Sequence, residues 1–426
     1  MSSATAIDDA TENSDPAPLS RVVGLDAARG LAVLGMFAVH VGPHPGEPGA
    51  GWLEIFSGRS SALFAVLAGV SLALLSGGER MPAGRAGRRV LVRIGARAVV
   101  IALIGLALVQ LRTPVMVILF YYGVFFLLSL PLLRLRPRTL ALIAFAWAIA
   151  GPIVSFLIRE RLAQNSFGGS PAFAMFGSWS GVREAFEMTL LTGAYPVLTW
   201  MPFLLAGLAL GRIGIRSMRP ALPLGVGAAL LALGYGGSWL AQHPLGGRRH
   251  LLDMLTAMLA ESGTSLDAGK LLDAGGGFGA VPTTSWWWLT VASPHSGTPF
   301  DILGATGVAF AVLGALLAVA ARLRAPLYPL IAAGSCALSL YVLQIVAIHL
   351  LMPVPDDPDV PLPDSGLHQP SWQLLTLFVA GSLLLATLWR SLFRRGPIEW
   401  ALHELTLRFT TLLLPSRRPS ANYSGT

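Results

Sequence analysis

The sequence is poor in the residues that soluble proteins use for surface charge and for cross-linking. Charged residues make up 12% of its 426 residues, whereas a soluble domain carries about 25%. The one cysteine, Cys336, excludes an intramolecular disulfide and a metal site built from several cysteines. Lysine is almost absent, since Lys270 is the only one and all other basic side chains are arginines.

Apolar residues take the place of the missing charge. They make up 54% of the chain, and the mean hydropathy is +0.65. Long apolar runs recur along the sequence, which predicts an all-α polytopic membrane protein. We place about ten transmembrane helices, at 22–42, 60–77, 90–111, 114–133, 139–158, 194–211, 221–241, 300–321, 327–350 and 372–392.

The arginines give these spans an orientation. Clusters around residues 80–93, 134–138, 212–219, 322–324 and 390–395 all fall in loops that follow an even number of spans. By the positive-inside rule, both termini are cytoplasmic and the protein lies in the cell (cytoplasmic) membrane. The net charge of +8 is explained by this topology, and we expect no nucleic-acid partner.

Composition divides the chain into four parts. Residues 1–20 are polar and acidic, and we expect a disordered cytoplasmic tail. Residues 21–395 form the transmembrane domain, 396–414 an amphipathic surface helix, and 415–426 a second disordered tail. Three outer loops of the transmembrane domain are long enough to form lids or binding surfaces, namely 159–193, 242–299 and 351–371.

The first span carries ionisable side chains within its helical pattern. Arg29 and His40 lie eleven residues apart, so both leave one face of a helix, separated by ~16 Å along its axis. Asp26 precedes Arg29 by three residues and shares that face. Ionisable groups inside a span usually mark a site or a water-filled cavity. The alternative is an interfacial ion pair with His40 as a hydrogen-bonded core residue.

A second basic stripe enters the third span from the cytoplasm. Arg89, Arg93 and Arg97 recur every four residues, and the last two reach into the span. Because guanidinium groups bind phosphates through two hydrogen bonds, this stripe predicts a donor with several phosphates. Topology and anionic lipid headgroups are the alternative explanation.

Two features further along the chain are candidates for binding the other substrate. Trp286, Trp287 and Trp288 follow one another in the second long outer loop, where they would either stack on sugar rings or anchor the chain at the membrane boundary. Gln344 lies within the ninth span, where it would bond another helix or meet a ligand.

Residues 21–44 resemble the start of the transmembrane acyltransferase superfamily, which includes heparan-α-glucosaminide N-acetyltransferase. The stretch L-D-A-A-R-G-L-A at 25–32 matches the L-D-x-x-R-G start of that superfamily, and Arg29 and His40 have its Arg-x10-His spacing. The segments at 195–212, 334–344 and G-P-I-E-W at 396–400 resemble a bacterial multi-span branch of the same group. In heparan-type members the critical histidine follows the first span, which makes His44 a rival for His40.

The resemblance implies an acyltransferase. The donor would be acetyl-CoA or another acyl-CoA on the cytoplasmic side, held by Arg29 and the arginines of the third span, with Asp26 orienting Arg29. His40 or His44 would be catalytic, the acceptor would be an extracytoplasmic glycan or glycolipid, and we expect no metal. The bilayer is a further partner, and a homodimer is left open. The same residues would also suit a transporter or flippase of a lipid-linked or anionic solute, or a membrane scaffold.

Overall fold

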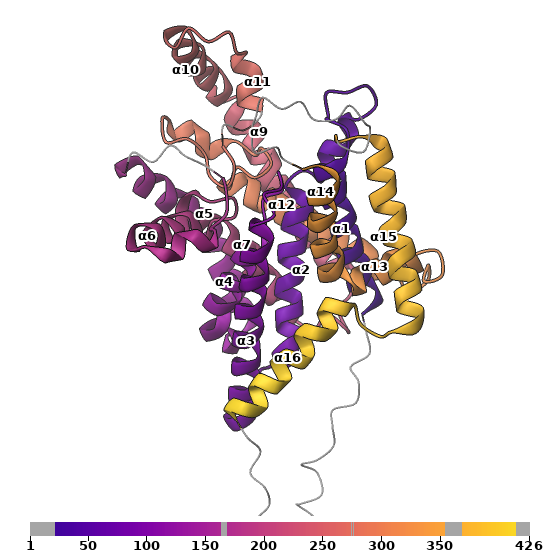
Figure 1. The fold of residues 1–426 in the computed structure, drawn as a ribbon. Helices are drawn as coiled ribbons and strands as arrows, with labels where there is room; N and C mark the ends of the chain where they lie inside the picture. The colour runs from indigo at the N-terminus through magenta and orange to yellow at the C-terminus, as the bar shows by residue number, and fades with distance from the viewer. Residues whose placement is uncertain (1–21, 163–167, 274, 276, 354–368, 415–426) are drawn as a thin grey trace, which may run out of the picture.

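The computed structural model describes residues 22–162, 168–273, 275, 277–353 and 369–414. Every regular element in these residues is helical, and the long helices stand side by side as a bundle (Figure 1). Within this described part of the chain, seven helices are long and apolar enough to cross a membrane, and up to nine spans result if each of two bent helix pairs counts as one. The prediction of an all-α polytopic membrane protein is therefore confirmed.

Each of the ten predicted segments corresponds to helical structure. The fourth consists of a short helix and a 3-10 turn, since α4 and the following 3-10 turn together cover Leu119–Arg134. The helices concerned are α1 Val23–Val41, α2 Arg59–Leu75, α3 Gly84–Val109, α4 Leu119–Ser129, α5 Pro137–Arg161, α7 Val197–Arg212, α8 Ala221–Leu231 with α9 Gly237–Gln242, α12 Pro299–Val319, α13 Tyr328–Ser335 with α14 Ala337–Leu351, and α15 Trp372–Leu392.

The ninth segment is broken, although its sequence predicts one continuous helix over 327–350. The chain bends by 81° between α13 and α14, at Cys336. Glycine and serine just before the bend are weaker helix formers than their neighbours. The break exposes the first backbone N–H groups of α14, and Glu399 of a later helix accepts hydrogen bonds from two of them, at Leu338 and Ser339.

Close helix contact explains the glycine at position 334, one residue before the end of α13. At Gly334 an added Cβ would overlap the backbone carbonyl of Asp26 in α1. Small residues let membrane helices approach one another, which strengthens van der Waals packing where no hydrophobic effect operates between them. The broken ninth segment is thus held directly against the ionisable end of α1.

The two ends of the bundle differ in structure. At one end, α16 (Pro397–Leu413) crosses beneath the long helices, near the point where α1 begins (Figure 1). At the other end, α10 (Gly247–Glu261) and α11 (Ala268–Asp273) stand clear of the bundle (Figure 1). The helix α6 (Trp179–Glu187) falls in the region predicted as the first long outer loop.

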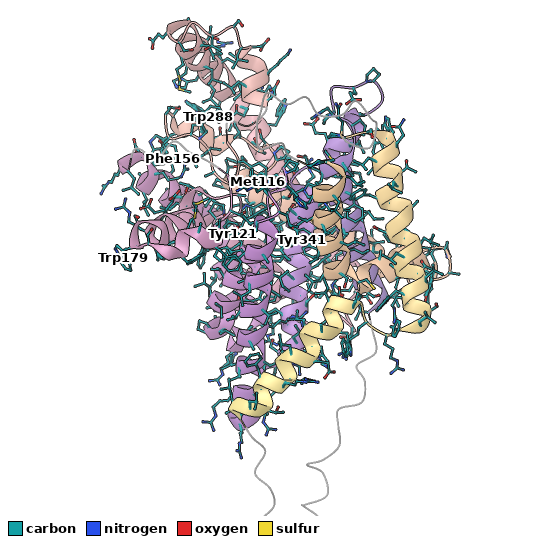
Figure 2. All side chains as sticks on the ribbon, in the orientation of Figure 1. Met116, Tyr121, Phe156, Trp179, Trp288 and Tyr341 are labelled. Carbon is teal, nitrogen blue, oxygen red and sulfur yellow. The ribbon has the colours of Figure 1, made fainter. Side chains whose placement is uncertain are left out.

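The tryptophan triplet lies in a 3-10 turn over Trp286–Thr290. Trp288 is 1% exposed and packs in a small separate core with Phe156, near which it lies in Figure 2. Trp286 is 53% exposed, and its ring centroid is 4.7 Å from that of Phe156. The triplet therefore joins the outer helices to the end of α5.

Arg212, which the sequence assigns to a topology cluster, is a buried structural side chain. It is 3% exposed and donates hydrogen bonds to the carbonyl oxygens of Ala73, Gly78 and Leu133, at 3.3, 2.5 and 2.6 Å, and to the hydroxyl of Ser76 at 2.8 Å. The last carbonyls of a helix have no partner within the helix, so one guanidinium here satisfies the end of α2 and the turn after α4.

Replacing Arg212 with methionine is expected to destabilise the protein by about 3–5 kcal/mol, because hydrogen-bond acceptors stay buried without a donor. The measurement is thermal unfolding of the purified protein in detergent. Arg219→Met is the matched control, since Arg219 is exposed in the same cluster and its loss should change stability by less than about 0.5 kcal/mol. Equal losses for both variants would show that Arg212 contributes charge only.

Candidate active site

Two cavities lie along α1, one near each end of the helix. We name them inner and outer after the predicted topology. The inner cavity, of about 440 Å³, is lined by Asp26 and Arg29 from the first turns of α1. The outer cavity, of about 470 Å³, is lined by Met36 and His40 from the last turns. The ionisable stripe predicted from the sequence is therefore divided between two chambers.

Arg29 is held in place on both sides of its guanidinium group. One nitrogen donates to the carboxylate of Asp26 at 2.7 Å, and the other donates to the hydroxyl of Ser71 in α2, also at 2.7 Å. Asp26 is buried, whereas Arg29 is partly exposed to the inner cavity. Asp26 therefore contacts Arg29 directly, whereas the role of this pair in holding a donor stays a prediction.

Four arginines from three other parts of the chain meet Arg29 at the inner cavity. Arg93 and Arg97 of the predicted stripe both line it, whereas Arg89 is exposed and lies outside the lining. Arg216 and Arg395 also line it, although the sequence indicates only topology for them. Within the described part of the chain, neither Arg93 nor Arg97 forms a salt bridge. The inner cavity thus presents a concentration of positive charge suited to a polyanion.

Helix α16 forms one wall of the inner cavity through Glu399 and His403. The Glu399 carboxylate accepts hydrogen bonds from the backbone N–H of Leu338 at 2.8 Å and of Ser339 at 3.3 Å, and from the Ser339 hydroxyl. Burial, together with Arg395 and Arg93, lowers the pKa of His403 below its usual range. His403 is therefore neutral near pH 7, and Glu399 is engaged with the end of α14.

In the outer cavity, His40 is bonded to the broken ninth segment. The side-chain amide of Gln344, which is 2% exposed, forms a hydrogen bond with Nδ1 of His40. This contact corresponds to the predicted alternative in which Gln344 bonds another helix. The bond fixes the orientation of the ring. The tautomer of the ring depends on whether the amide nitrogen or the amide oxygen of Gln344 faces Nδ1.

His44, the rival candidate, also lines the outer cavity but is exposed. Its backbone N–H donates to the carboxylate of Glu47 at 3.0 Å within the loop after α1. No described side chain holds its imidazole as Gln344 holds that of His40. The structure therefore offers two histidines at one cavity, of which the one inside the span has the better-defined position.

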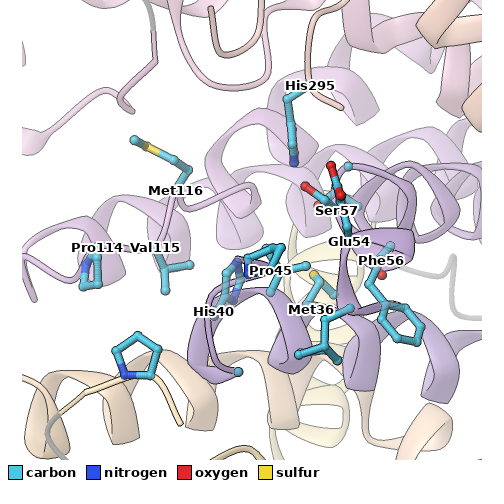
Figure 3. A pocket seen from close by; sticks show the side chains of 18 of the residues that line it. Met36, His40, Pro45, Glu54, Phe56, Ser57, Pro114, Val115, Met116 and His295 are labelled. Atoms are coloured by element: carbon cyan, nitrogen blue, oxygen red, sulfur yellow. The ribbon is translucent and has the colours of Figure 1, made fainter. Parts of the chain in front are cut away.

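A third histidine lines the same cavity, and sequence reasoning missed it. His295 lies in the loop before α12, and it enters the cavity opposite His40 and near Ser57 (Figure 3). Its ring stacks on Phe278 with centroids 4.1 Å apart and on Trp200 at 5.6 Å. Burial and the nearby His40 lower the pKa of His295 to about 3. The only sequence signal was its Ser-Pro-His-Ser-Gly turn in a long outer loop.

An aromatic stack lies where the two cavities approach each other. Phe64 and Tyr122 line the inner cavity, while Ser60 and Ser61, one turn earlier in α2, line the outer one. The ring of Phe64 stacks on those of Tyr122 and Tyr341, at 5.6 and 6.4 Å. One helical turn rises ~5 Å, so the residues of α2 that line the two cavities are about one turn apart.

The tryptophan triplet lies apart from both cavities. None of Trp286, Trp287 and Trp288 is among the residues that line them. The Nε1 group of Trp288 donates to the hydroxyl of Thr284 at 3.1 Å, which ties this side chain into the outer core. The predicted contact between these rings and a sugar stays a prediction.

Comparison with known protein families matches two separate regions of the chain, and each region supplies residues to the cavities. A family model described as heparan-alpha-glucosaminide N-acetyltransferase, catalytic, matches residues 21–235, a little over half of the chain. A model described as a protein of unknown function (DUF418) matches residues 270–409. No curated protein matches the chain. The first region contains Arg29, His40, Arg93 and Arg97. The second contributes His295 and Glu399 to the same two cavities, and Gln344 as the partner of His40.

The match to the first model indicates membrane acetyltransferase activity in a multi-pass protein. It covers the L-D-A-A-R-G-L-A stretch and the Arg-x10-His spacing on which the sequence resemblance rested. The chain therefore belongs to the heparan-alpha-glucosaminide N-acetyltransferase catalytic family.

Proposed function

We propose that this protein transfers an acyl group, most simply acetyl, from cytoplasmic acyl-CoA to an extracytoplasmic glycan or glycolipid. One observation carries the proposal. Helix α1 places an arginine in a basic inner cavity and a histidine in an outer cavity, and residues of α2 line both cavities. A donor with phosphates at one end and a reactive acyl group at the other fits that arrangement.

The inner cavity would hold the nucleotide end of acyl-CoA. Its five lining arginines outnumber its two acidic side chains, and both carboxylates are already engaged, Asp26 with Arg29 and Glu399 with the end of α14. Guanidinium groups form paired hydrogen bonds with phosphate oxygens. In this proposal Arg93 and Arg97 bind phosphates directly, and Arg29 marks the inner limit of the pantetheine arm.

The acyl group would pass the level of Phe64 and reach His40. A histidine near neutral pH can act as a general base towards the acceptor or as a nucleophile that carries the acyl group. Both roles need a free Nε2, which requires the proton on Nδ1. The amide of Gln344, whose nitrogen faces Nδ1 in the structure, must then turn over so that its oxygen accepts that proton. This positioning of the ring parallels the third member of a catalytic triad.

The outer cavity would receive the acceptor. It is lined by the hydroxyl of Ser57 and the carboxylate of Glu54, as well as by His44 and His295 (Figure 3). These groups can hydrogen-bond a sugar hydroxyl or amine, while the methionine and aromatic side chains around them exclude bulk water from the reacting atoms. This mixed lining supports the proposal of a sugar acceptor.

Sided proteoliposomes test the proposal. Protein is reconstituted in one orientation, with acetyl-CoA labelled in its acetyl group on the face of α16 and glucosamine on the face of α10. We expect labelled N-acetylglucosamine on the α10 side and free CoA on the other. If labelled glucosamine crosses the membrane unacetylated, a transporter is indicated. If neither product nor flux appears and acetyl-CoA does not bind, the proposal is wrong.

Gln344→Leu is expected to slow transfer by about 10²-fold, because the ring of His40 loses the partner that sets its tautomer and orientation. The measurement is the rate of acetyl transfer at saturating acetyl-CoA, together with the binding constant for acetyl-CoA. Binding should stay within about twofold, since Gln344 lies outside the inner cavity. A glutamate at this position should retain far more activity, and equal losses in both variants would count against a positioning role.

A further inference from the structure

His295 is held in a backbone conformation that histidine seldom adopts. Its φ is +59°, and only one other non-glycine residue in the described chain, Arg112, has a positive φ. Such conformations cost about 1–3 kcal/mol and persist where the surroundings enforce them, most often at functional sites. The strained backbone therefore indicates a functional role for the His295 side chain.

The loop around His295 is bound at each step. The carbonyl of His295 accepts a hydrogen bond from the N–H of Gly279 at 2.7 Å, and the N–H of Gly297 donates to Asp301 at 3.1 Å. At Gly58 in front of α2, an added Cβ would lie 3.1 Å from the backbone nitrogen of His295. The backbone of the turn is thus fixed against three other segments.

The ring of His295 points towards the outer cavity. The ring is 7% exposed and stacked on Phe278 and Trp200, and a ring nitrogen lies at the end that points towards the cavity in Figure 3. The Nδ1 atom is buried without a hydrogen-bond partner among the described residues. A buried polar atom left without a partner is costly, and each such case calls for an explanation. A role in accepting a proton from a substrate would explain this unpartnered atom.

The chemistry of transfer leaves a role for such a group. If Nε2 of His40 attacks the thioester carbonyl, the carbon–sulfur bond breaks and CoA leaves as a thiolate, which takes a proton from the inner solution. His40 then carries the acyl group and has no lone pair with which to accept the proton of the incoming hydroxyl or amine. The second half of the reaction needs another base on the acceptor side.

We propose that His295 is this second base, a proposal that rests on the proposed acyl transfer. As the acceptor oxygen or nitrogen attacks the acyl carbon, its proton passes to His295, the bond between that carbon and His40 breaks, and His295 releases the proton to the outer solution. The region of the chain that matches only a family of unknown function thereby supplies the group that completes the reaction.

Acetyl-CoA alone provides the test, with water as the acceptor. Wild type, His295→Asn and His40→Asn are mixed with acetyl-labelled acetyl-CoA, and protein-bound label is followed after excess donor is removed. Asparagine tolerates a positive φ, so the loop should keep its shape. We expect His295→Asn to be labelled to the same stoichiometry as wild type but to lose its label about 10²–10⁴-fold more slowly. His40→Asn should not be labelled.

His295→Gly adds a second readout, since glycine removes the backbone strain and leaves space for a free imidazole. Imidazole in solution should speed the loss of label from this variant and leave His250→Asn, an exposed outer histidine variant, at the wild-type rate. Loss of label at the wild-type rate in His295→Asn would overturn the inference while leaving acyl transfer by His40 intact. An unlabelled wild type would remove the covalent step itself, and with it both proposals.

Discussion

Replacement of His40 with asparagine is expected to lower acetyl transfer by at least 10²–10⁴-fold, because asparagine cannot act as a base or carry the acyl group near neutral pH. Folding should be little affected, since asparagine keeps a hydrogen-bonding partner for Gln344. The measurement is the transfer rate in purified protein, alongside thermal unfolding and acetyl-CoA binding. Binding should be unchanged, because the arginines lie in the other cavity.

His44→Asn is the matched control for this prediction. It lies four residues later, at the exposed rim of the same cavity, and no described side chain fixes its ring. We expect a change in transfer of less than about tenfold, as for removal of a group that contacts substrate without taking its proton. If His44→Asn abolishes transfer and His40→Asn does not, the catalytic histidine lies in the loop, and the span residue is structural.

The double variant Arg93→Gln, Arg97→Gln is expected to weaken acetyl-CoA binding by about 10²–10⁴-fold. Each hydrogen bond between charged groups contributes about 1.5–3 kcal/mol, and two arginines lost from a partly dehydrated site give about 3–6 kcal/mol. Part of this attraction is long-range, so the difference from wild type should shrink as salt is raised. Equilibrium binding of acetyl-CoA at two ionic strengths measures both effects.

Arg89→Gln separates phosphate binding from topology. Arg89 belongs to the same stripe of α3 but is exposed and lies outside the inner cavity, so its loss should change binding by less than about threefold. Protein abundance in the membrane should be equal for wild type, the double variant and Arg89→Gln. Equal binding by the double variant and by Arg89→Gln would mean that the arginines of α3 serve only to orient the helix.

The parts of the site that the sequence predicted are those set by local geometry. Arg29 and His40 share a face because the helix repeats every 3.6 residues, and Arg93 and Arg97 share one for the same reason. The positions of spans followed from apolar length, which the bilayer dictates. In each case the spacing along the chain determines the spacing in space, so no knowledge of tertiary contacts was needed.

The remaining features depend on contacts between distant segments. The bend at Cys336 is stabilised by Glu399, which lies 63 positions later, and periodicity over 327–350 carries no trace of it. From the sequence, Arg216 and Arg395 indicate only topology, because cytoplasmic loops are rich in arginine whether or not those arginines line a cavity. His295 lies in a loop without periodicity, and only its φ and its stacking reveal that it is built into the site.

The continuity of α1 also limits which donors the protein can use. The helix runs unbroken from Val23 to Val41, so the rise between Arg29 and His40 acts as a ruler of ~16 Å. Under the proposed function, a donor anchored by its phosphates delivers its acyl group only if a flexible arm spans that length. Acetyl phosphate, in which phosphate and acyl group share one oxygen, is too short to reach both ends, and should occupy the arginines without acylating the histidine.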